Sequence, residues 1–250
     1  MPVTETAPVS VVTGGGSGIG QAAGVALAAL GHHVVFCGRT AESVSRSRDI
    51  AESGEALVLD VTDESAVDAV FADIARRRGR IDVLVNSAGV FGSQKPISET
   101  SLTDWTQTMD TNVTGSFLCA RAAMRLMARQ EPYGGRIINI GSVSAQVPRP
   151  HATPYTASKF AINGLTRALA LEGRDSDIAV GQVDIGNAAT TMTSGFEKGS
   201  LQADGSIRPE AKFDASHVAS TIAHIASLPR EVNIPFLTIM ATRMPLLGRG

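Results

Sequence analysis

The amino-acid sequence predicts an α/β domain with a doubly wound, parallel, seven-stranded sheet and helices on both faces. Short apolar runs alternate along the chain with longer segments of helical periodicity. Several of these runs are apolar without alternation, as expected of strands that helices cover on both faces. A length of 250 residues suits one large domain better than two small ones. We therefore expect residues 1–250 to form a single domain.

The order of the segments supports this fold class. The expected strands are Val9–Val12, Val34–Cys37, Ala56–Leu59, Ile81–Val85, Arg136–Ile140, Ile178–Val183 and Phe236–Met240. The expected helices are Gly18–Leu30, Ala41–Glu52, Glu64–Arg78, Leu102–Arg129, Thr153–Glu172 and Ala215–Ser227. Repeated strand–helix–strand units with right-handed crossovers give a doubly wound sheet. The ligands of such a sheet bind beyond the carboxyl ends of its strands.

One segment breaks the alternation. Residues 188–213 contain Gly195, Gly199, Gly205 and Pro209, with scattered polar residues and little periodicity. An irregular connection of that length is unusual in a compact domain and is typically a binding loop. We expect a substrate loop or lid here, and the alternative is a loop with no role in binding.

Composition and charge exclude several classes of function. A net charge of −2 offers no general attraction to nucleic acid or to an anionic membrane. Cys37 and Cys119 lie in apolar runs and are expected to be buried thiols, and no short-spaced Cys or His pair indicates a metal site. Met1–Pro8 has neither a basic start nor a long apolar run, so we expect no signal peptide, no membrane span and a cytoplasmic location.

The first expected strand leads into the turn Thr13-Gly14-Gly15-Gly16-Ser17-Gly18-Ile19-Gly20, and a helix follows. The start of a helix has unpaired N–H groups and a partial positive charge, which attract phosphate. Glycines let the backbone turn sharply and let a pyrophosphate approach without a Cβ clash. Glycines also make plain turns, but the strand before and the helix after favour a Rossmann fold that binds a dinucleotide. Gly20 is expected to let the helix pack near the sheet.

The end of the second strand indicates which dinucleotide is bound. An NAD enzyme usually has an acidic residue there, which accepts hydrogen bonds from the adenosine ribose. This chain has Gly38 followed by Arg39, and an arginine can bind the 2′-phosphate of NADP. We expect NADP(H) to be preferred, with NAD(H) possible, and the alternative is a solvent-facing arginine. Thr40 could donate a further hydrogen bond, while Asp60 is expected to border the adenine or to cap the next turn.

Tyr155 and Lys159 are spaced i, i+4 in a helical pattern and therefore share a face. A free tyrosine has a pKa of about 10, and a neighbouring ammonium favours the phenolate. Ser142 follows an expected strand, and its hydroxyl could bind a substrate oxygen beside the tyrosine. Asn112 lies inside a long helical segment, where asparagine is a poor helix former. It could cap, point to solvent or hold a water molecule in a proton relay.

Taken together, these residues resemble the short-chain dehydrogenase/reductase family over essentially the whole chain. The matching motifs are Thr13-Gly14-x-x-x-Gly18-Ile19-Gly20, Asp60, Asn86-Ser87-Ala88-Gly89, Asn112, Ser142, Tyr155-x-x-x-Lys159 and Gly186 with Thr190. The resemblance implies hydride transfer between nicotinamide and a carbonyl carbon, with Tyr155 as the general acid/base. It implies that Lys159 holds the nicotinamide ribose and lowers the pKa of Tyr155. It also implies that Ser142 positions the reacting oxygen and that Asn112 anchors a relay water.

These motifs give a full set of expected site residues. The catalytic residues are Asn112, Ser142, Tyr155 and Lys159, and the substrate-binding residues are Ser142, Ser144 and Tyr155. The cofactor-binding residues are Gly14, Gly16, Ser17, Gly18, Ile19, Gly20, Arg39, Thr40, Asp60, Val61, Asn86, Ala88, Gly89, Tyr155, Lys159, Gly186, Ala188 and Thr190. The chain departs from the family pattern at Ser87, which replaces an asparagine, and at Ile185, which replaces a proline. Ser17 stands where many NADP enzymes have a basic residue, so Arg39 is left as the obvious phosphate ligand.

Three functions stay open at this stage. The first is a reductase or dehydrogenase of a free small-molecule carbonyl or alcohol. The second is a 3-oxoacyl thioester reductase, for which Arg121, Arg125 and Arg129 could dock an acyl carrier protein, although such a stripe could equally face solvent or a second subunit. The third is a non-catalytic NADP-binding protein. The resemblance also implies a homotetramer or homodimer, whereas the apolar residues Met240, Met244, Leu246 and Leu247 could instead pack on their own subunit.

Overall fold

The computed structural model describes residues 7–246, apart from the side chains of residues 196–198, and its centre is a parallel sheet of seven strands. In chain order these strands are β1 (Val9–Thr13), β2 (His33–Gly38), β3 (Glu55–Val58), β4 (Val83–Asn86), β5 (Gly135–Ile140), β6 (Ile178–Ile185) and β11 (Phe236–Ile239). The α-helices are α1 (Gly18–Ala29), α2 (Ala41–Ala51), α3 (Glu64–Arg78), α4 (Leu102–Met109), α5 (Gly115–Met127), α6 (Thr153–Glu172) and α7 (Ala215–Ser227). The predicted fold class is confirmed.

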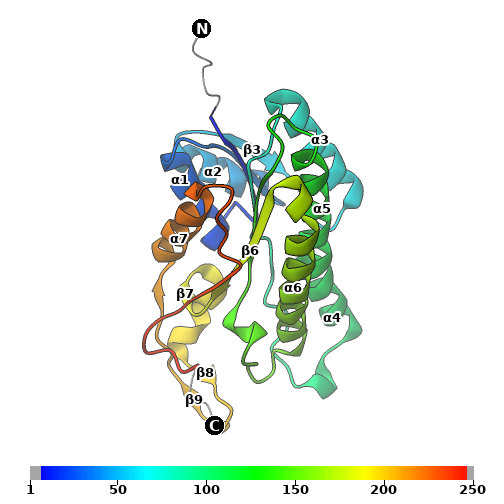
Figure 1. The fold of residues 1–250 in the computed structure, drawn as a ribbon. Coiled ribbons are helices and arrows are strands. Elements are labelled where there is room, and N and C mark those ends of the chain that lie inside the picture. The colour runs from blue at the N-terminus through cyan, green and yellow to red at the C-terminus, as the bar shows by residue number, and fades with distance from the viewer. Residues whose placement is uncertain (1–6, 247–250) are drawn as a thin grey trace.

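Helices cover both faces of this sheet, with α1, α2 and α7 on one side and α3, α4, α5 and α6 on the other (Figure 1). The strands supply both hydrophobic cores because their side chains alternate. In β2, Val34 and Phe36 pack with α1 and α7, while Val35 and Cys37 pack with α3 and α5. Double coverage of this kind explains why the strands have apolar residues at successive positions.

The strand order places the ligand site. Across the sheet the strands lie in the order β11-β6-β5-β4-β1-β2-β3, so the chain winds outward from β1 to β3 and then returns to β4. β1 and β4 are hydrogen-bonded neighbours, with Thr13 opposite Asn86. The winding direction reverses between them, and ligands of open α/β sheets bind at this point, beyond the strand ends. There the Thr13 hydroxyl accepts hydrogen bonds from the backbone N–H groups of Ser87 and Ala88.

The helix expected over Leu102–Arg129 is interrupted, which corrects the sequence prediction. Between α4 and α5 the chain forms a π-helical turn, η2 (Asp110–Thr114). Asn112 lies in this turn, and its side chain hydrogen-bonds to the loop after β4 and to α6. A single π turn of this kind commonly marks a functional site, because the extra residue redirects a side chain.

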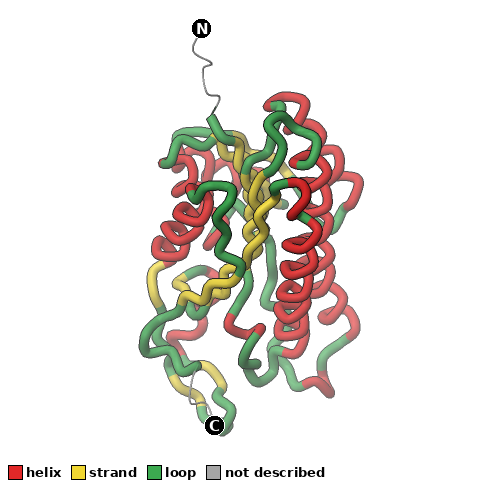
Figure 2. Tube along the Cα trace, in the orientation of Figure 1, coloured by secondary structure: helices red, strands yellow, loops and turns green. Residues whose placement is uncertain are grey.

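The 188–213 segment is more regular than its composition suggested. β7 (Ala188–Ala189) pairs with β10 (Phe213–Asp214), and β8 (Ser200–Leu201) pairs with β9 (Ile207–Arg208). A 3₁₀ segment, η5 (Thr191–Lys198), lies between them. Figure 2 shows these short elements interleaved with loops at the lower end of the molecule. The sequence showed no periodicity here because each element is too short to display one.

The C-terminal tail packs onto its own chain. Met244 and Leu246 are buried in a small cluster with Val143 and Ala241. Leu247 lies outside the described residues, as do residues 1–6 of the N-terminal segment. Among residues 7–246, no helix combines the length and the apolar character needed to cross a membrane.

Candidate active site

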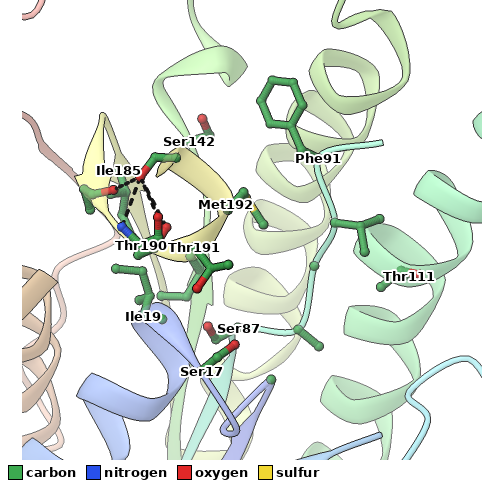
Figure 3. Close-up of a pocket in the computed structure, with 18 of the residues that line it drawn as sticks. Ser17, Ile19, Ser87, Phe91, Thr111, Ser142, Ile185, Thr190, Thr191 and Met192 are labelled. Atoms are coloured by element: carbon green, nitrogen blue, oxygen red, sulfur yellow. Dashed lines mark hydrogen bonds between the residues drawn. The ribbon is translucent and has the colours of Figure 1, made fainter. Parts of the chain in front are cut away.

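A cleft runs along the carboxyl ends of the strands, with walls from the turns after β1, β2, β4, β5 and β6 and from the 188–213 segment. Figure 3 shows Ser17 and Ile19 at the start of α1 and Phe91 on the loop that follows β4. Ser142 and Ile185 come from the ends of β5 and β6, and Thr190, Thr191 and Met192 approach from the 188–213 segment. The cleft therefore joins the glycine-rich turn to the residues predicted to be catalytic.

One end of the cleft is suited to an anion. Gly14 has a φ angle of 64°, and a Cβ on it would lie 2.8 Å from the backbone nitrogen of Ala88. Ser17, the N-cap of α1, makes no side-chain capping hydrogen bond, and the first turn of α1 contains no acidic residue. The N–H groups of that turn therefore keep their partial positive charge for a ligand. The glycine turn thus has the space and the donors that a pyrophosphate needs.

The next part of the cleft follows β2 and β3 and contains Arg39, Thr40, Asp60 and Val61. Asp60 accepts hydrogen bonds from the Thr62 backbone N–H at 3.0 Å and from the Thr62 hydroxyl at 2.8 Å. These hydrogen bonds, together with the nearby Arg39 guanidinium, hold the pKa of Asp60 below its ordinary value. Asp60 thus caps its own turn and also borders the cleft beside Arg39.

Helix α6 places Tyr155 and Lys159 on its buried face. Residues at helical spacing line this face, namely Tyr155, Ser158, Lys159, Ile162, Thr166 and Leu169. Tyr155 is 9% exposed and Lys159 is 7% exposed. The Lys159 ammonium donates a 2.8 Å hydrogen bond to the Ile140 carbonyl and lies 5.6 Å from the centre of the Tyr155 ring. The ammonium is therefore anchored at the end of β5, beside the phenol.

The pKa of Tyr155 is raised above its ordinary value, whereas the sequence led us to expect a lowered one. Burial is the main cause, and the negative charge of Asp184 acts in the same direction. A hydrogen bond with Ser142 and the charge of Arg149 oppose the rise without cancelling it. Burial also lowers the pKa of Lys159 to about 8. Desolvation of both groups therefore opposes the lowering that the sequence led us to expect from Lys159.

Ser142 follows β5 and begins a short 3₁₀ turn, η3 (Val143–Ala145). Its hydroxyl accepts a 3.1 Å hydrogen bond from the Ser144 N–H, and its own N–H donates to the Asp184 carboxylate at 3.1 Å. Ser142 and Tyr155 both line this end of the cleft. Two hydroxyls at the end of the cleft can bind one carbonyl oxygen.

Asn112 and Asn86 do not line the cleft, and both stabilise its surroundings. Asn112 is 2% exposed, so it does not point to solvent. Its amide donates to the Val90 carbonyl and to the Ser158 hydroxyl, both at 2.9 Å, and its oxygen accepts from the Val90 N–H at 2.8 Å. Asn86 donates to Asn139 at 3.0 Å, across the β4–β5 pair.

Most of the other predicted residues line the cleft. These are Gly14, Gly16, Ser17, Gly18, Ile19, Arg39, Thr40, Asp60, Val61, Ala88, Gly89, Ser142, Ser144, Tyr155, Lys159, Gly186, Ala188 and Thr190. Gly20 is absent from the lining, and a Cβ on it would overlap the Gly14 carbonyl oxygen. It therefore lets α1 pack closely, as predicted, without contacting the cleft. Within the described part of the chain, no group of His, Cys, Asp and Glu side chains could hold a metal ion.

The sequence pattern did not reveal two apolar residues of the cleft, Phe91 and Met192. The Phe91 ring stacks on the Tyr155 ring with the centroids 4.5 Å apart. Met192 lies across the cleft from Phe91 (Figure 3). The apolar Phe91 side chain therefore lies directly against the Tyr155 ring. Phe91 stands alone in a loop and Met192 lies in the short 3₁₀ segment η5, so no periodicity marked either residue.

Arg149 is a charged residue that also lines the cleft, in the loop between β5 and α6. It forms a bidentate ion pair with Glu210, with N–O distances of 2.9 and 2.6 Å, and it donates a 2.9 Å hydrogen bond to the Asn187 side chain. The side chains of Arg149 and Glu210 are only 8% and 2% exposed. This pair joins the loop between β5 and α6 to the 188–213 segment. The sequence could not reveal this pair, because two residues 61 positions apart leave no local pattern.

Comparisons with known proteins agree with this geometry. The family model described as short chain dehydrogenase matches residues 8–200. The chain is 36% identical over 232 residues to a 3-oxoacyl-[acyl-carrier-protein] reductase of Synechocystis, covering 90% of this chain and 91% of the relative. It is 36% identical over 189 residues to a 3beta-hydroxysteroid dehydrogenase of Mediterraneibacter gnavus, covering 74% of this chain and 67% of the relative. The crystal structure of an actinorhodin polyketide ketoreductase with NADPH superposes with a TM-score of 0.84 at 28% identity, covering 94% of this chain and 96% of that one.

Proposed function

The chain belongs to the short-chain dehydrogenase family, and from that premise we propose that it is an NADP(H)-dependent enzyme that interconverts a ketone or aldehyde and an alcohol. Its relatives are dehydrogenases and reductases that act on CH–OH and carbonyl groups. One observation carries the proposal: Ser142, Tyr155 and Lys159 line one cleft, which begins at the uncapped end of α1, and the Lys159 ammonium lies 5.6 Å from the centre of the Tyr155 ring.

In this proposal each residue has a role that its surroundings support. When bound, the nicotinamide cofactor supplies the hydride chemistry. Ser142 and Tyr155 hold the substrate oxygen, and Tyr155 exchanges the proton there. Because burial raises the pKa of Tyr155, the phenol is protonated at neutral pH and suits donation to a carbonyl. The same side chain accepts the proton when the reaction runs from the alcohol to the carbonyl. Lys159 places its ammonium 5.6 Å from the centre of the Tyr155 ring, and Asn112 fixes the loop after β4 against α6.

The preference for NADP(H) rests on Arg39. It follows β2 at the wall of the cleft, where an enzyme specific for NAD would have a carboxylate. Solved relatives occur with NADPH and with NADH, so the family alone supports only a nicotinamide cofactor. A guanidinium at this position favours the additional phosphate of NADP.

We propose a free, small carbonyl compound as the substrate, with an uncharged group beside the carbonyl. Phe91 and Met192 offer an apolar wall, and Glu210 neutralises the one arginine near Tyr155 that lines the described cleft. The 188–213 segment acts as the substrate lid, because Thr190 to Thr193 form part of this wall.

A 3-oxoacyl thioester is the second candidate, since the Synechocystis relative is a 3-oxoacyl-[acyl-carrier-protein] reductase. The arginine stripe supports it less well than the sequence suggested. Arg121 pairs with Glu64 at 2.6 Å, and Arg125 lies 3.9 Å from Asp68. Two of the three arginines therefore already form ion pairs with acidic residues of α3. A pantetheine-linked 3-oxoacyl substrate reduced far better than a free ketone would favour this second candidate.

The test of the proposed function compares the two tyrosines of the chain. Tyr155→Phe should keep NADPH affinity and reduce carbonyl turnover by about a thousandfold or more, because general acid catalysis and oxygen binding are lost together. Tyr133→Phe, at the exposed tyrosine, should leave turnover unchanged. The assay is NADPH oxidation with a panel of ketones and aldehydes. Full activity of Tyr155→Phe would refute the mechanism.

We also propose a cytoplasmic homotetramer or homodimer. Exposed apolar side chains on neighbouring helices support self-association, namely Leu102 on α4, Phe117 on α5 and Phe160 on α6. Light scattering coupled to size-exclusion chromatography measures the mass directly. A monomer at micromolar concentration would contradict this part of the proposal.

A further inference from the structure

The turn Ile140–Gly141–Ser142 at the end of β5 is held from two sides by opposite charges. On one side the Lys159 ammonium donates a 2.8 Å hydrogen bond to the Ile140 carbonyl. On the other side the Asp184 carboxylate, on β6, accepts a 3.1 Å hydrogen bond from the Ser142 N–H. Because Ser142 carries one of the two hydroxyls at the reacting centre, both charged groups influence the position of that hydroxyl.

Asp184 is a buried carboxylate that is 3% exposed. Besides the Ser142 N–H, it accepts from Gln182 Nε2 at 2.7 Å and from Gln146 Nε2 at 3.1 Å. These donors are neutral amides, and within the described residues no cationic side chain forms an ion pair with Asp184. Ser142 and Gln182 donate to Oδ1 and Gln146 donates to Oδ2, so both carboxylate oxygens act as acceptors. These hydrogen bonds favour a carboxylate over an asparagine, which has one acceptor oxygen, and they offset part of the free energy that burial of the charge costs.

The carboxylate lies directly against the backbone of the turn. A Cβ on Gly141 would overlap Asp184 Oδ1, so the close approach requires glycine at this position. The Gly141 N–H also donates to the Val183 carbonyl at 2.9 Å, which fixes the turn to β6. The negative charge is thus held close to the anchor point of Lys159.

We propose that Asp184 is a positioning residue of the reaction, whose negative charge fixes the Ile140–Ser142 turn and keeps the buried Lys159 ammonium in its charged form. This inference rests on the proposed function, since it assigns a role within the same site. The charge is needed because the ammonium itself is buried, and a lysine that loses its proton no longer provides a positive charge beside Tyr155.

The negative charge of Asp184 raises the pKa of both Lys159 and Tyr155. Burial lowers the pKa of Lys159 to about 8, and Asp184 opposes that decrease. Asp184 also contributes to the raised pKa of Tyr155, while Arg149 in the loop before α6 acts in the opposite direction. Glu210 is the ion-pair partner of Arg149. Removal of the Asp184 charge should therefore lower the pKa of both Lys159 and Tyr155.

The test is the pH profile of carbonyl reduction by Asp184→Asn. Reduction requires a protonated Tyr155 and a charged Lys159, so the rate falls as pH rises through their pKa values. The variant should move this fall to lower pH by about one unit, the order expected for a unit charge several ångströms away in a partly buried site. Asp184→Ser also removes the charge and should give the same shift if the asparagine variant folds poorly.

Gln146→Leu is the matched control, because it removes one neutral donor to Asp184 and keeps the charge. Its profile should keep the wild-type midpoint. A profile of Asp184→Asn that loses amplitude with no change in midpoint would overturn the proposal, because a purely structural role predicts that result.

A second measurement does not depend on turnover. The chain has two tyrosines, so Tyr133→Phe leaves Tyr155 as the only one, and its ionisation can be followed by tyrosinate absorbance, with circular dichroism reporting the fold. Adding Asp184→Asn should lower the titration midpoint, and an unchanged midpoint would count against the proposal. If no carbonyl substrate is turned over but the midpoint still falls, the proposed function fails while the electrostatic role of Asp184 stands.

Discussion

The buried ion pair between Arg149 and Glu210 offers a quantitative test of how the 188–213 segment is held. Glu210→Gln removes the negative charge, keeps the side-chain length and leaves the Arg149 guanidinium buried without its counter-charge. Gln202 and Asn187 also donate to Glu210, at 2.9 and 2.7 Å, so the substitution disturbs a network that joins the 188–213 segment to the loop beside Tyr155.

The expected loss of stability follows from two arguments that agree. Despite the cost of burial, hydrogen bonds from Arg149, Gln202 and Asn187 lower the pKa of Glu210 from 4.5 to about 2. A shift of this size corresponds to about 3 kcal/mol of preference for the charged form in the folded state. Removing one member of a buried pair typically costs about 3–5 kcal/mol. We expect a decrease of about 3 kcal/mol in the free energy of unfolding, or about 6–12 °C in Tm.

Urea denaturation and thermal melting at neutral pH measure this loss, and the KM for the carbonyl substrate reports on the wall that Arg149 forms. Arg208→Gln is the control, because it removes the pair with Asp204 in the same segment, where both side chains are more than half exposed. Exposed pairs contribute about 0.2–1 kcal/mol, so this variant should melt near the wild type. A Glu210→Gln variant with wild-type Tm and KM would refute the argument.

The same pair predicts a direction for the pH dependence of stability. Because the pKa of Glu210 is lowered in the folded state, its contribution is fully present above its ordinary value of 4.5 and is lost as pH falls toward 2. The difference in stability between the wild type and Glu210→Gln should therefore shrink over this acidic range. A constant difference from neutral pH down to about pH 2 would mean that the charge of Glu210 is not its source.

Two further variants test the cofactor end of the cleft. Arg39→Leu should raise the KM for NADPH by about 10- to 100-fold, because one charge-assisted contact is lost. The KM for NADH should change little. Equal changes for both cofactors would contradict a phosphate-binding role. Gly14→Ala should weaken NADPH binding by about tenfold or more, because its Cβ would meet the Ala88 backbone at 2.8 Å and because alanine disfavours the φ angle of 64°. Titration by protein fluorescence measures the change. Wild-type affinity would show that the turn tolerates a side chain.

The features that could be predicted from sequence are local ones. Gly79 illustrates this, because a glycine directly after a helical segment rich in arginine predicts a C-cap, and in the structure it closes α3 with a φ angle of 76°. The glycine-rich turn after β1 is local in the same way. Tyr155 and Lys159 meet on one face because helical spacing places them there. Each of these patterns spans only one or two turns of chain.

The features that the sequence did not reveal depend on distant contacts. The π turn at Asn112 forms where that side chain bonds to Val90 and Ser158, 22 and 46 residues away. The direction of the Tyr155 pKa shift was wrong because helical spacing places Lys159 near the ring but gives no measure of burial. Local spacing fixes which residues meet, whereas their desolvation is a property of the whole fold.

The residues proposed to carry out the reaction are therefore of a different kind from the residues proposed to select the substrate. Tyr155 and Lys159 come from one helix and Ser142 from one strand end, so local motifs within this fold place them. The wall beside them comes from Phe91, Arg149, Met192 and Glu210, which lie in loops that share no repeat. Asp184 differs from these loop residues, because its side chain on β6 contacts the turn of Ser142 and acts on the pKa of both Tyr155 and Lys159. Substitutions in the loops should therefore change which carbonyl is bound, while substitutions at Asp184 should change the pH at which any carbonyl is reduced.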